Sequence, residues 1–316
     1  MKTLKYLFLK MLLHTQIHVF LAVFALASCF LPNIFPLVLF KSFAVHIALG
    51  LYFVSFIYLL IKRLRIFLMY FFVATLIFFN ISSFIFRNNH SDSSVVIDFT
   101  LAHFNVFYLN KNYEQMTNII LESEADMVSL QEVDKKWAQA LENALPKKYP
   151  HYQIRVDGKN SGGGMAIFSK IPFVQLDSLR FDDLPYFFGK VKIKDQILSF
   201  FVAHTYSPSN FVYYVRRNRQ FSAIRDFLSK KESPLVFIGD LNAVGWDNEV
   251  LQTEKRLFLQ DSRRGFEATF PAFAQNFGIP IDYIFHSPQI ICLDFKTIKT
   301  NSDHLGILGK YYFKNP

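Results

Sequence analysis

The segment Leu235–Asn242, LVFIGDLN, joins a short apolar run directly to polar residues. Leu235–Ile238 consists of four apolar residues, which predicts a strand buried on both faces. Asp240 and Asn242 follow this strand at once, where a loop at the end of a rigid strand can aim a side chain. The same two residues can also form a simple turn, because Asp and Asn side chains bond their own backbone. This segment alone leaves both a turn and a functional site open.

The same arrangement recurs at five other places along the chain. Each place sets a polar side chain beside four or more apolar residues. The six sites are Asn105 in AHFNVF, Glu132 in SLQEVD, His204 in FFVAHTYSP, Asp240 with Asn242 in VFIGDLNA, Asp282 in GIPIDYIF, and Asp303 with His304 in SDHLGI. One such residue is usually a cap or a satisfied buried group. Six of them, rich in Asp, Glu, Asn and His, predict a shared functional site at the ends of strands.

Four short motifs in this region occur in a recognisable order. QE at 131–132, GDLN at 239–242, IDYIF at 281–285 and SDH at 302–304 together resemble the endonuclease/exonuclease/phosphatase superfamily, over about residues 95–312. SGGGMAIFSKIP at 161–172 resembles the family's strand after the second helix, and DSRRGFEATFP at 261–271 resembles its membrane-tethered bacterial branch. The resemblance implies an α+β fold: a four-layer α/β/β/α sandwich of two mixed β-sheets flanked by helices.

The apolar periodicity independently suggests a mixture of strand pairs and helices, with sheets packed face to face and helices outside. Helical patterns cover Tyr113–Glu124, Trp137–Leu145 and about 210–230. Strands are expected at Val95–Phe107, Met127–Leu130, 152–156, 164–169, 173–180, 188–193, 197–203, Leu235–Ile238, 281–286, 290–298 and 305–312. On the third helix, Arg216, Arg217 and Arg219 form a basic run that is either a solvated face or a contact with phosphates.

The resemblance also implies a divalent cation, usually Mg²⁺, with Mn²⁺ as the alternative. By position, the resemblance makes Glu132 the main metal ligand and places Asn105 and Asp303 close to the metal. It implies that Asp240 and Asn242 face the scissile phosphate and that His204 and His304 lie beside that phosphate. It also implies that Asp282 orients His304. Mg²⁺ takes oxygen ligands and keeps several waters, so one or two carboxylates and a substrate phosphate oxygen suffice. No Cys/His cluster in the sequence suggests a zinc site.

Hydrolysis of a phosphate ester needs a positioned water, stabilised phosphate charge and a protonated leaving group. His304 paired with Asp282 suits a general base, because a carboxylate holds the imidazole tautomer and stabilises the imidazolium. Asp240 is the other candidate for the base, and the sequence leaves that choice open. His204 suits phosphate stabilisation or proton donation to the leaving oxygen, and Asn242 can donate hydrogen bonds to the phosphate without adding charge.

The N-terminal third differs from the rest in charge and hydropathy. The first 90 residues carry 8 Lys and Arg and no acidic residue, whereas the remainder carries 26 basic and 25 acidic residues. Three apolar stretches, Met11–Leu31, Ser42–Ile61 and Ile66–Phe86, each approach the ~20 residues that cross a bilayer. These features predict a membrane anchor with three transmembrane helices at 1–87, a polar linker at 88–94 and the catalytic domain at 95–316. A cleaved signal peptide is the alternative for the first stretch.

Basic residues beside the apolar stretches predict the orientation. Lys2, Lys5 and Lys10 favour a cytoplasmic N-terminus, and the group Lys62, Arg63 and Arg65 favours a cytoplasmic loop before the last stretch. With three spans, the catalytic domain lies on the far side of the membrane, in a periplasmic or extracellular location. Lys41 falls on the opposite side and weakens this prediction slightly.

These features together predict a membrane-anchored, metal-dependent phosphodiesterase or phosphatase that hydrolyses a phosphate ester with activated water. Its partners are a phosphate-ester substrate and the lipid bilayer, and the sequence indicates no protein partner. Tethering favours a phospholipid head group as substrate, and the near-neutral catalytic domain mildly disfavours DNA or RNA. A nuclease outside the cytoplasm and a non-catalytic membrane sensor or scaffold on the same fold remain as alternatives.

Overall fold

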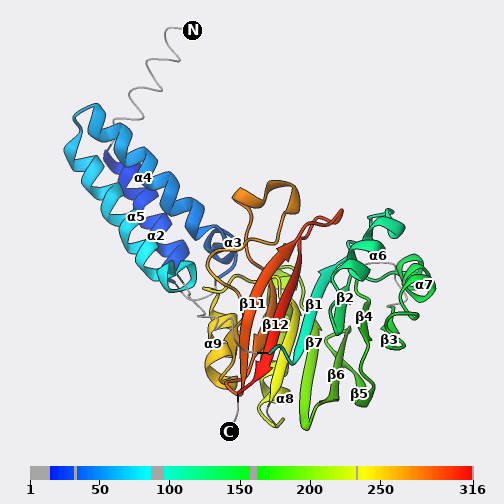
Figure 1. Cartoon of the computed structure of the whole chain (residues 1–316). Helices are drawn as coiled ribbons and strands as arrows, with labels where there is room; N and C mark the ends of the chain where they lie inside the picture. Colours follow the sequence, from blue (N-terminus) through cyan, green and yellow to red (C-terminus); the bar gives the residue numbers. More distant parts are fainter. Residues whose placement is uncertain (1–14, 32–33, 87–95, 157–161, 233, 315–316) are drawn as a thin grey trace. The chain divides into compact units, whose positions relative to one another are not determined.

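A computed structural model describes residues 15–31, 34–86, 96–156, 162–232 and 234–314 (Figure 1). The chain divides into an N-terminal helical unit, which extends to Ile85 and also includes Trp246–Asn248, and a larger unit formed by Phe86–Gly245 and Glu249–Pro316. The predicted linker, 88–94, lies outside the described residues. The same applies to the basic N-terminal segment and the beginning of the first apolar stretch.

The helical unit contains α2 (Thr15–Phe30), α3 (Leu37–Ser42), α4 (Ala44–Leu60) and α5 (Leu64–Ile85). Three transmembrane helices are not supported. Among the described residues only α5, with 22 residues, is both long and apolar enough to cross a bilayer. Helix α4 has 17 residues, fewer than the predicted stretch Ser42–Ile61, which also includes the end of α3 and the turn residues Phe43 and Ile61. At about 1.5 Å per residue such a helix reaches only about 26 Å, short of the ~30 Å core.

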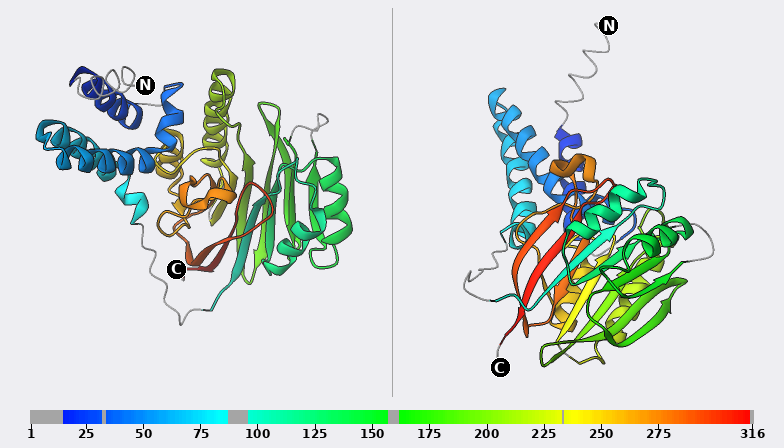
Figure 2. Two further views of the ribbon diagram at one scale, coloured as in Figure 1. Left: turned by 90° about the horizontal axis from the view of Figure 1, so that it is seen from above. Right: turned by 45° about the vertical axis from the view of Figure 1, so that its right-hand side comes forward.

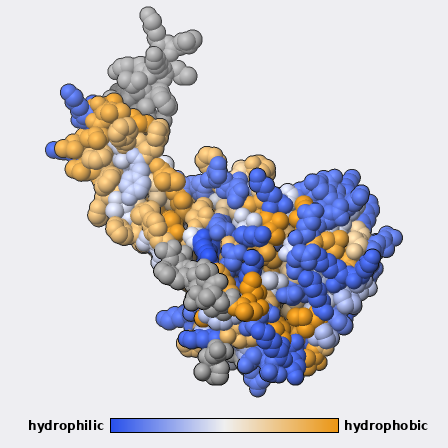
Figure 3. Space-filling view, viewed as in Figure 1, coloured by the Kyte–Doolittle hydropathy of each residue, from blue (hydrophilic) through white to orange (hydrophobic). Residues whose placement is uncertain are grey.

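Polar side chains of this unit face one another, and its outer surface is apolar. His18 on α2 lies 2.8 Å from the Tyr70 hydroxyl on α5 and 3.3 Å from the Tyr58 hydroxyl on α4. Phe53 and Phe79 expose 68% and 69% of their surface. Figure 3 shows the hydrophobic colour over these helices, in contrast with the mostly hydrophilic surface of the larger unit. Apolar residues such as Ala48 and Ile77 are also buried inside the unit, so it is apolar both inside and outside, whereas the outer face of a water-soluble bundle is polar.

The larger unit contains two six-stranded sheets packed face to face (Figure 2). The first sheet consists of β1 (Phe99–Asn105), β2 (Met127–Gln131), β3 (His151–Arg155), β4 (Met165–Ser169), β11 (Ile290–Ile298) and β12 (Gly306–Phe313). The second consists of β5 (Phe173–Phe181), β6 (Leu184–Ile193), β7 (Gln196–His204), β8 (Leu235–Asp240), β9 (Gln260–Asp261) and β10 (Asp282–His286).

Both sheets are mixed. The strand orders are β11-β12-β1-β2-β4-β3 and β5-β6-β7-β8-β10-β9. One pair in each sheet is parallel, β1 with β2 and β7 with β8, and the other pairs are antiparallel. A parallel pair needs a crossover, and α6 (Tyr113–Glu122) and α8 (Phe211–Leu228) supply the two crossovers.

Three apolar layers hold the sandwich together. Alternation along the strands places Leu101 of β1 between the sheets and Phe104 on the outer face. The outer face of the first sheet packs against α6 and α7 (Lys135–Ala144), and that of the second against α8 and α9 (Asn248–Leu257). The expected sandwich of two mixed sheets flanked by helices is confirmed. The sequence patterns missed α9, β9 and the 3-10 helix Ala272–Phe277, and β6 begins four residues before the predicted strand.

Candidate active site

The topology brings the predicted site residues to one edge of the sandwich. Asn105 ends β1, and Glu132 follows β2, which runs parallel beside it. In the second sheet His204 ends β7 and pairs with Asp240 at the end of β8, and Asp282 begins the antiparallel β10 opposite Asp240. Asp303 and His304 precede β12, which runs antiparallel to β1. Carboxyl ends of parallel strands meet the amino ends of their antiparallel neighbours, so residues from six segments converge.

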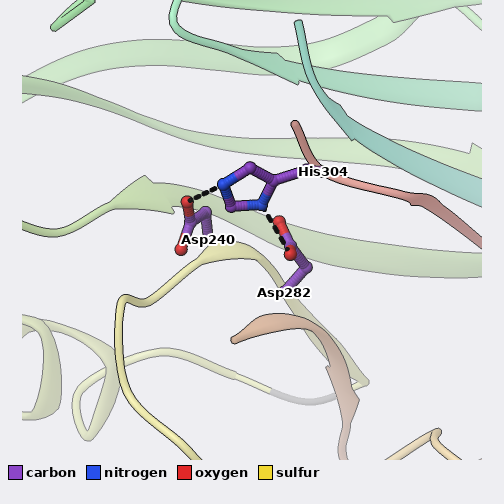
Figure 4. Close-up of side chains that lie close together, drawn as sticks. All are labelled: Asp240, Asp282 and His304. Atoms are coloured by element: carbon purple, nitrogen blue, oxygen red, sulfur yellow. Dashed lines mark hydrogen bonds and ion pairs between the residues drawn. The ribbon is translucent and has the colours of Figure 1, made fainter. Parts of the chain in front are cut away.

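The centre of the site consists of Asp240, Asp282 and His304, all buried (Figure 4). His304 Nδ1 lies 2.9 Å from Asp282 Oδ2, and His304 Nε2 lies 3.7 Å from Asp240 Oδ2. The imidazole therefore stands between two carboxylates: it is hydrogen-bonded to Asp282 on one side and lies within ion-pair distance of Asp240 on the other. The ring of Phe270 packs on the imidazole with centroids 4.9 Å apart, which restricts its movement.

Burial and mutual charge change the protonation of these three groups. Burial opposes the charge of His304, but the carboxylates of Asp282 and Asp240 outweigh it and raise the pKa of His304 to about 10. Burial, together with the charge of Asp282, raises the pKa of Asp240 to about 6, against the opposing influence of His304. Burial also disfavours the charge of Asp282, yet its contacts with His304 and His103 hold the pKa of that carboxyl well below its usual range.

Asn105 connects Glu132 to Asp240. Its Nδ2 donates to Glu132 Oε1 at 3.0 Å and to Asp240 Oδ2 at 3.2 Å, while its Oδ1 accepts from the Phe107 amide at 3.0 Å. Glu132 Oε2 also accepts from the Tyr108 amide at 3.2 Å. The backbone of Glu132 has φ of 61°, a conformation that is strained for a residue with a Cβ and concentrates at functional sites.

Asp303 lies close to Glu132 in the same cleft. Burial raises the pKa of Asp303, and the neighbouring charge of Glu132 raises it further. Among the described residues, neither carboxylate forms an ion pair with a Lys or Arg. The charge of His304 lowers the pKa of Asp303 in opposition to these two effects, but Glu132 and Asp303 still repel each other, and an oxygen-preferring cation between them would remove that cost. The donor chemistry at Glu132 and Asp303 therefore fits Mg²⁺ or Mn²⁺.

Asp240, Asp282 and His304 form a second cluster that could in principle hold a metal, with ligand atoms within 4.8 Å of one another. However, Asp282 Oδ1 already lies 3.0 Å from His103 Nε2, and Asp282 Oδ2 lies 2.9 Å from His304 Nδ1. Both oxygens face imidazole rings, which leaves poor access for a cation. This cluster is better suited to moving or holding protons.

His204 and Asn242 line the cleft beside Asp240. Asn242 Nδ2 lies 3.5 Å from His204 Nε2, and His204 Nε2 lies 3.8 Å from Asp240 Oδ2. Burial lowers the pKa of His204, with the charge of Asp240 opposing it, so the ring is neutral at pH 7. Asn242 has φ of 46°, and its carbonyl accepts from the buried Arg217 at 3.0 Å. Arg217 is therefore neither a solvated residue nor a phosphate contact, because it supports the GDLN loop from behind.

Two buried polar residues of the site were not predicted. His103 on β1 contacts Asp282, and Gln131 Oε1 on β2 accepts from the Asp240 amide at 2.8 Å. Gln131 Nε2 also donates to the Ala203 carbonyl. Both side chains cross from the first sheet to the second, directly beneath the cleft. The sequence did contain a pattern that indicates both residues. His103 is on the same strand face as Asn105, and Gln131 immediately precedes Glu132.

The site opens into a cleft of about 660 Å³. Six of the eight predicted site residues line this cleft, and the buried Asn105 and Asp282 do not. Other lining residues are Arg180, Leu184, Tyr206, Tyr213 and Arg216. The rings of Tyr206 and Tyr213 stack at 5.2 Å with planes 2° apart, and the Arg216 guanidinium lies 4.3 Å from the Tyr206 centroid. A cleft that combines these polar residues with an aromatic wall suits a ligand that carries a phosphate and a bulkier group.

Several solved structures have a similar fold. An endonuclease/exonuclease/phosphatase from Beutenbergia cavernae is 17% identical with a TM-score of 0.59, over 69% of this chain and 72% of that chain. D. rerio TDP2 complexed with a single-strand DNA product is 18% identical with a TM-score of 0.57, over 68% and 98%. Sphingomyelinase C from Streptomyces griseocarneus is 18% identical with a TM-score of 0.51, over 67% and 98%.

At these identities the likeness to solved structures demonstrates the fold alone. A search of curated proteins finds no match to the sequence. The model of the Endonuclease/Exonuclease/phosphatase family matches residues 102–304, which is more than half of the chain and includes every predicted site residue. The chain therefore belongs to the endonuclease/exonuclease/phosphatase family.

Proposed function

We propose that this protein is a divalent-metal-dependent phosphodiesterase or phosphatase held at a membrane by its N-terminal helices. One observation carries the proposal: four carboxylates and two imidazoles converge on one edge of the sandwich, with His304 held between Asp240 and Asp282. Such a density of buried ionisable groups is costly to folding, and it is typical of catalytic sites. Family membership supports phosphate-ester hydrolysis.

The cation would be held by Glu132 and Asp303, and Asn105 orients Glu132 through the bond to its Oε1. When bound, Mg²⁺ or Mn²⁺ supplies positive charge that stabilises the phosphate oxygens as they gain charge. Asn105 was expected to be close to the metal. Its Nδ2 points at two carboxylates and its Oδ1 accepts from a backbone amide, so its contribution is to position Glu132.

The protonation of the remaining residues suggests their roles. Asp240, with a pKa of about 6, is ionised at neutral pH and can accept a proton from an attacking water. His304, with a pKa of about 10, is an imidazolium that lines the cleft, so it suits stabilisation of phosphate charge better than base catalysis. The neutral His204 and the amide of Asn242 can hydrogen-bond the phosphate or the leaving oxygen.

Membrane attachment is inferred from α5 and from the apolar outer surface of the helical unit. The 22-residue α5 can span a bilayer, and the contacts of His18 with Tyr58 and Tyr70 satisfy polar groups inside the unit. The basic residues flanking the apolar stretches favour a catalytic unit outside the cytoplasm. Shorter helices such as α4 can still be accommodated in a bilayer by local thinning.

A phospholipid head group is the preferred substrate. An enzyme tethered to a bilayer meets lipid substrates on the same surface, and the near-neutral catalytic unit lacks the excess of basic residues that phosphate backbones attract. The structural neighbours include both a sphingomyelinase C and a TDP2 with a single-strand DNA product, so both substrate classes occur on this fold. Nucleic acid is therefore the alternative that the experiment must resolve.

The decisive experiment is an assay of the full chain reconstituted in nanodiscs. Hydrolysis of bis(p-nitrophenyl) phosphate, a panel of phospholipids, single-stranded DNA and RNA is measured with Mg²⁺, with Mn²⁺ and with EDTA. The Glu132→Gln variant is the matched control, because it keeps the side-chain shape and removes the charge that a metal needs. We expect metal-dependent hydrolysis of the simple ester and of a phospholipid. Cleavage of DNA or RNA alone would establish the nuclease, and equal inactivity of the wild type and variant would favour a non-catalytic scaffold.

A further inference from the structure

A fully buried histidine, His103, stands behind the catalytic group. It belongs to β1, two residues before Asn105, and its side chain has 0% exposure. His103 Nε2 lies 3.0 Å from Asp282 Oδ1, and His103 Nδ1 lies 3.3 Å from Ser129 Oγ. Ser129 is its register partner on β2. The imidazole therefore connects a residue of the first sheet to the carboxylate in the second sheet that contacts His304.

The geometry around Asp282 gives His103 a specific task. Asp282 places one oxygen against His103 and the other against His304, at 3.0 Å and 2.9 Å. Rotation of the carboxylate about its Cβ–Cγ bond would break one of the two contacts. His103 thus determines the plane of the carboxylate and, through it, the position of the His304 ring. In the neutral ring, Nε2 donates to the Asp282 carboxylate, which can only accept and therefore selects the tautomer, and Nδ1 accepts from the Ser129 hydroxyl.

A purely structural role accounts poorly for these residues. Leu101, two positions earlier on the same strand face, fills the space between the sheets with hydrocarbon. An imidazole and a hydroxyl in the next position lose solvation on burial, and only hydrogen bonds offset that loss. Their hydrogen bonds lead to Asp282, and through its second oxygen to His304. A packing requirement alone would be met by an apolar side chain.

We propose that His103 is a positioning residue for phosphate-ester hydrolysis, which holds the Asp282 carboxylate so that its second oxygen orients His304. This inference rests on the proposed function. It adds a third histidine to the site, one that does not line the cleft and touches neither metal nor substrate. The order of hydrogen-bonded groups is Ser129, His103, Asp282 and His304, and His304 faces Asp240 at 3.7 Å in the cleft.

The test compares His103→Leu with His103→Gln in the full chain in nanodiscs. The Gln amide can still donate to Asp282, and Leu cannot. With bis(p-nitrophenyl) phosphate and Mg²⁺, we expect His103→Leu to lower kcat by about 30-fold or more, because carboxylate–imidazole orientation contributes mainly in the transition state. KM should stay within about threefold and His103→Gln within about fivefold of the wild-type kcat. The control is His286→Gln, a buried histidine at the other end of β10, which should retain kcat within about twofold.

A spectroscopic readout makes the test independent of turnover. The downfield proton on His304 Nδ1, assigned by its loss in His304→Gln, should shift or broaden in His103→Leu and persist in His286→Gln. Equal kcat losses in the Leu and Gln variants, an unchanged kcat in a folded His103→Leu, or an unchanged proton resonance would overturn the proposal. If His103→Leu does not fold, Ser129→Ala must shift the same resonance. Failure of the proposed function is distinguishable, since the wild type would then be insensitive to EDTA and to Glu132→Gln.

Discussion

His304 is buried, and its environment consists mainly of two neighbouring carboxylates. Its imidazole is bonded to Asp282 on one side and faces Asp240 on the other. We expect His304→Gln to lower kcat for a phosphate ester by about 10³-fold or more, because a neutral amide cannot stabilise developing phosphate charge as an imidazolium does. Steady-state kinetics with circular dichroism as the folding control measure this. A folded variant with near wild-type kcat would remove His304 from the chemistry.

The charge of His304 also couples stability to pH. Its folded pKa of about 10 exceeds the ordinary value of 6.5, so the protonated ring stabilises the fold. That contribution is fully present below pH 6.5 and is lost as pH rises through about 10. In EDTA, the thermal midpoint reported by the buried Trp137 should fall over this window in the wild type and change less in His304→Gln. Parallel curves for the two proteins would show that His304 does not carry this dependence.

At the scale of elements, the close pairing of β7 with β8 depends on Gly239, which lies within β8. Its φ is 153°, and a Cβ there would lie 1.8 Å from the Ala203 carbonyl of β7. Gly239→Ala must therefore separate the parallel strands that carry His204 and Asp240. We expect a loss of about 2–4 kcal/mol in the free energy of unfolding, together with a lower kcat. Denaturant titration gives the first quantity. A loss of less than about 0.5 kcal/mol would mean that the two strands separate easily.

The beginning of α8 supplies the aromatic wall of the cleft. Tyr213 exposes 39% of its surface and stacks on Tyr206, which Arg216 covers. We expect Tyr213→Ala to leave stability within about 0.5 kcal/mol and to raise KM for the physiological substrate several-fold, with little change for bis(p-nitrophenyl) phosphate. Parallel kinetics on the two substrates measure the difference. Equal effects on both would indicate a general disturbance of the cleft instead of a contact with the larger group.

At the scale of the whole molecule, the helical unit is expected to make the chain an integral membrane protein. The outer surface of the helices is apolar, with Phe53 and Phe79 more than two-thirds exposed, and its exposure to water is energetically unfavourable. We expect the full chain to remain in the membrane pellet after alkaline carbonate extraction, and a reporter fused after Pro316 to be active outside the cytoplasm. Release into the supernatant would contradict the anchor, and a cytoplasmic reporter signal would contradict the orientation alone.

Part of this protein could be predicted from sequence because the information is local. Buried strands are short apolar runs, so β2, β4 and β8 were predicted within two residues at each end. The polar residues at their ends were visible for the same reason, since a carboxylate beside four apolar residues stands out. α9 was missed because its apolar face consists of few residues, and the length of α4 was overestimated because hydropathy does not show where a helix begins.

The amino-acid sequence by itself determined the family, the two-sheet fold and the identity of the residues at the cleft, because each is written in short motifs and in hydrophobic alternation. Only the tertiary structure decided which groups touch. Asp282 meets both His103 and His304, residues 179 and 22 positions away, and the charges of Asp282 and Asp240 raise the pKa of His304 above its ordinary value. The physical reason is that hydrogen bonds and charge interactions act over a few ångströms in space, across separations along the chain that no local pattern records.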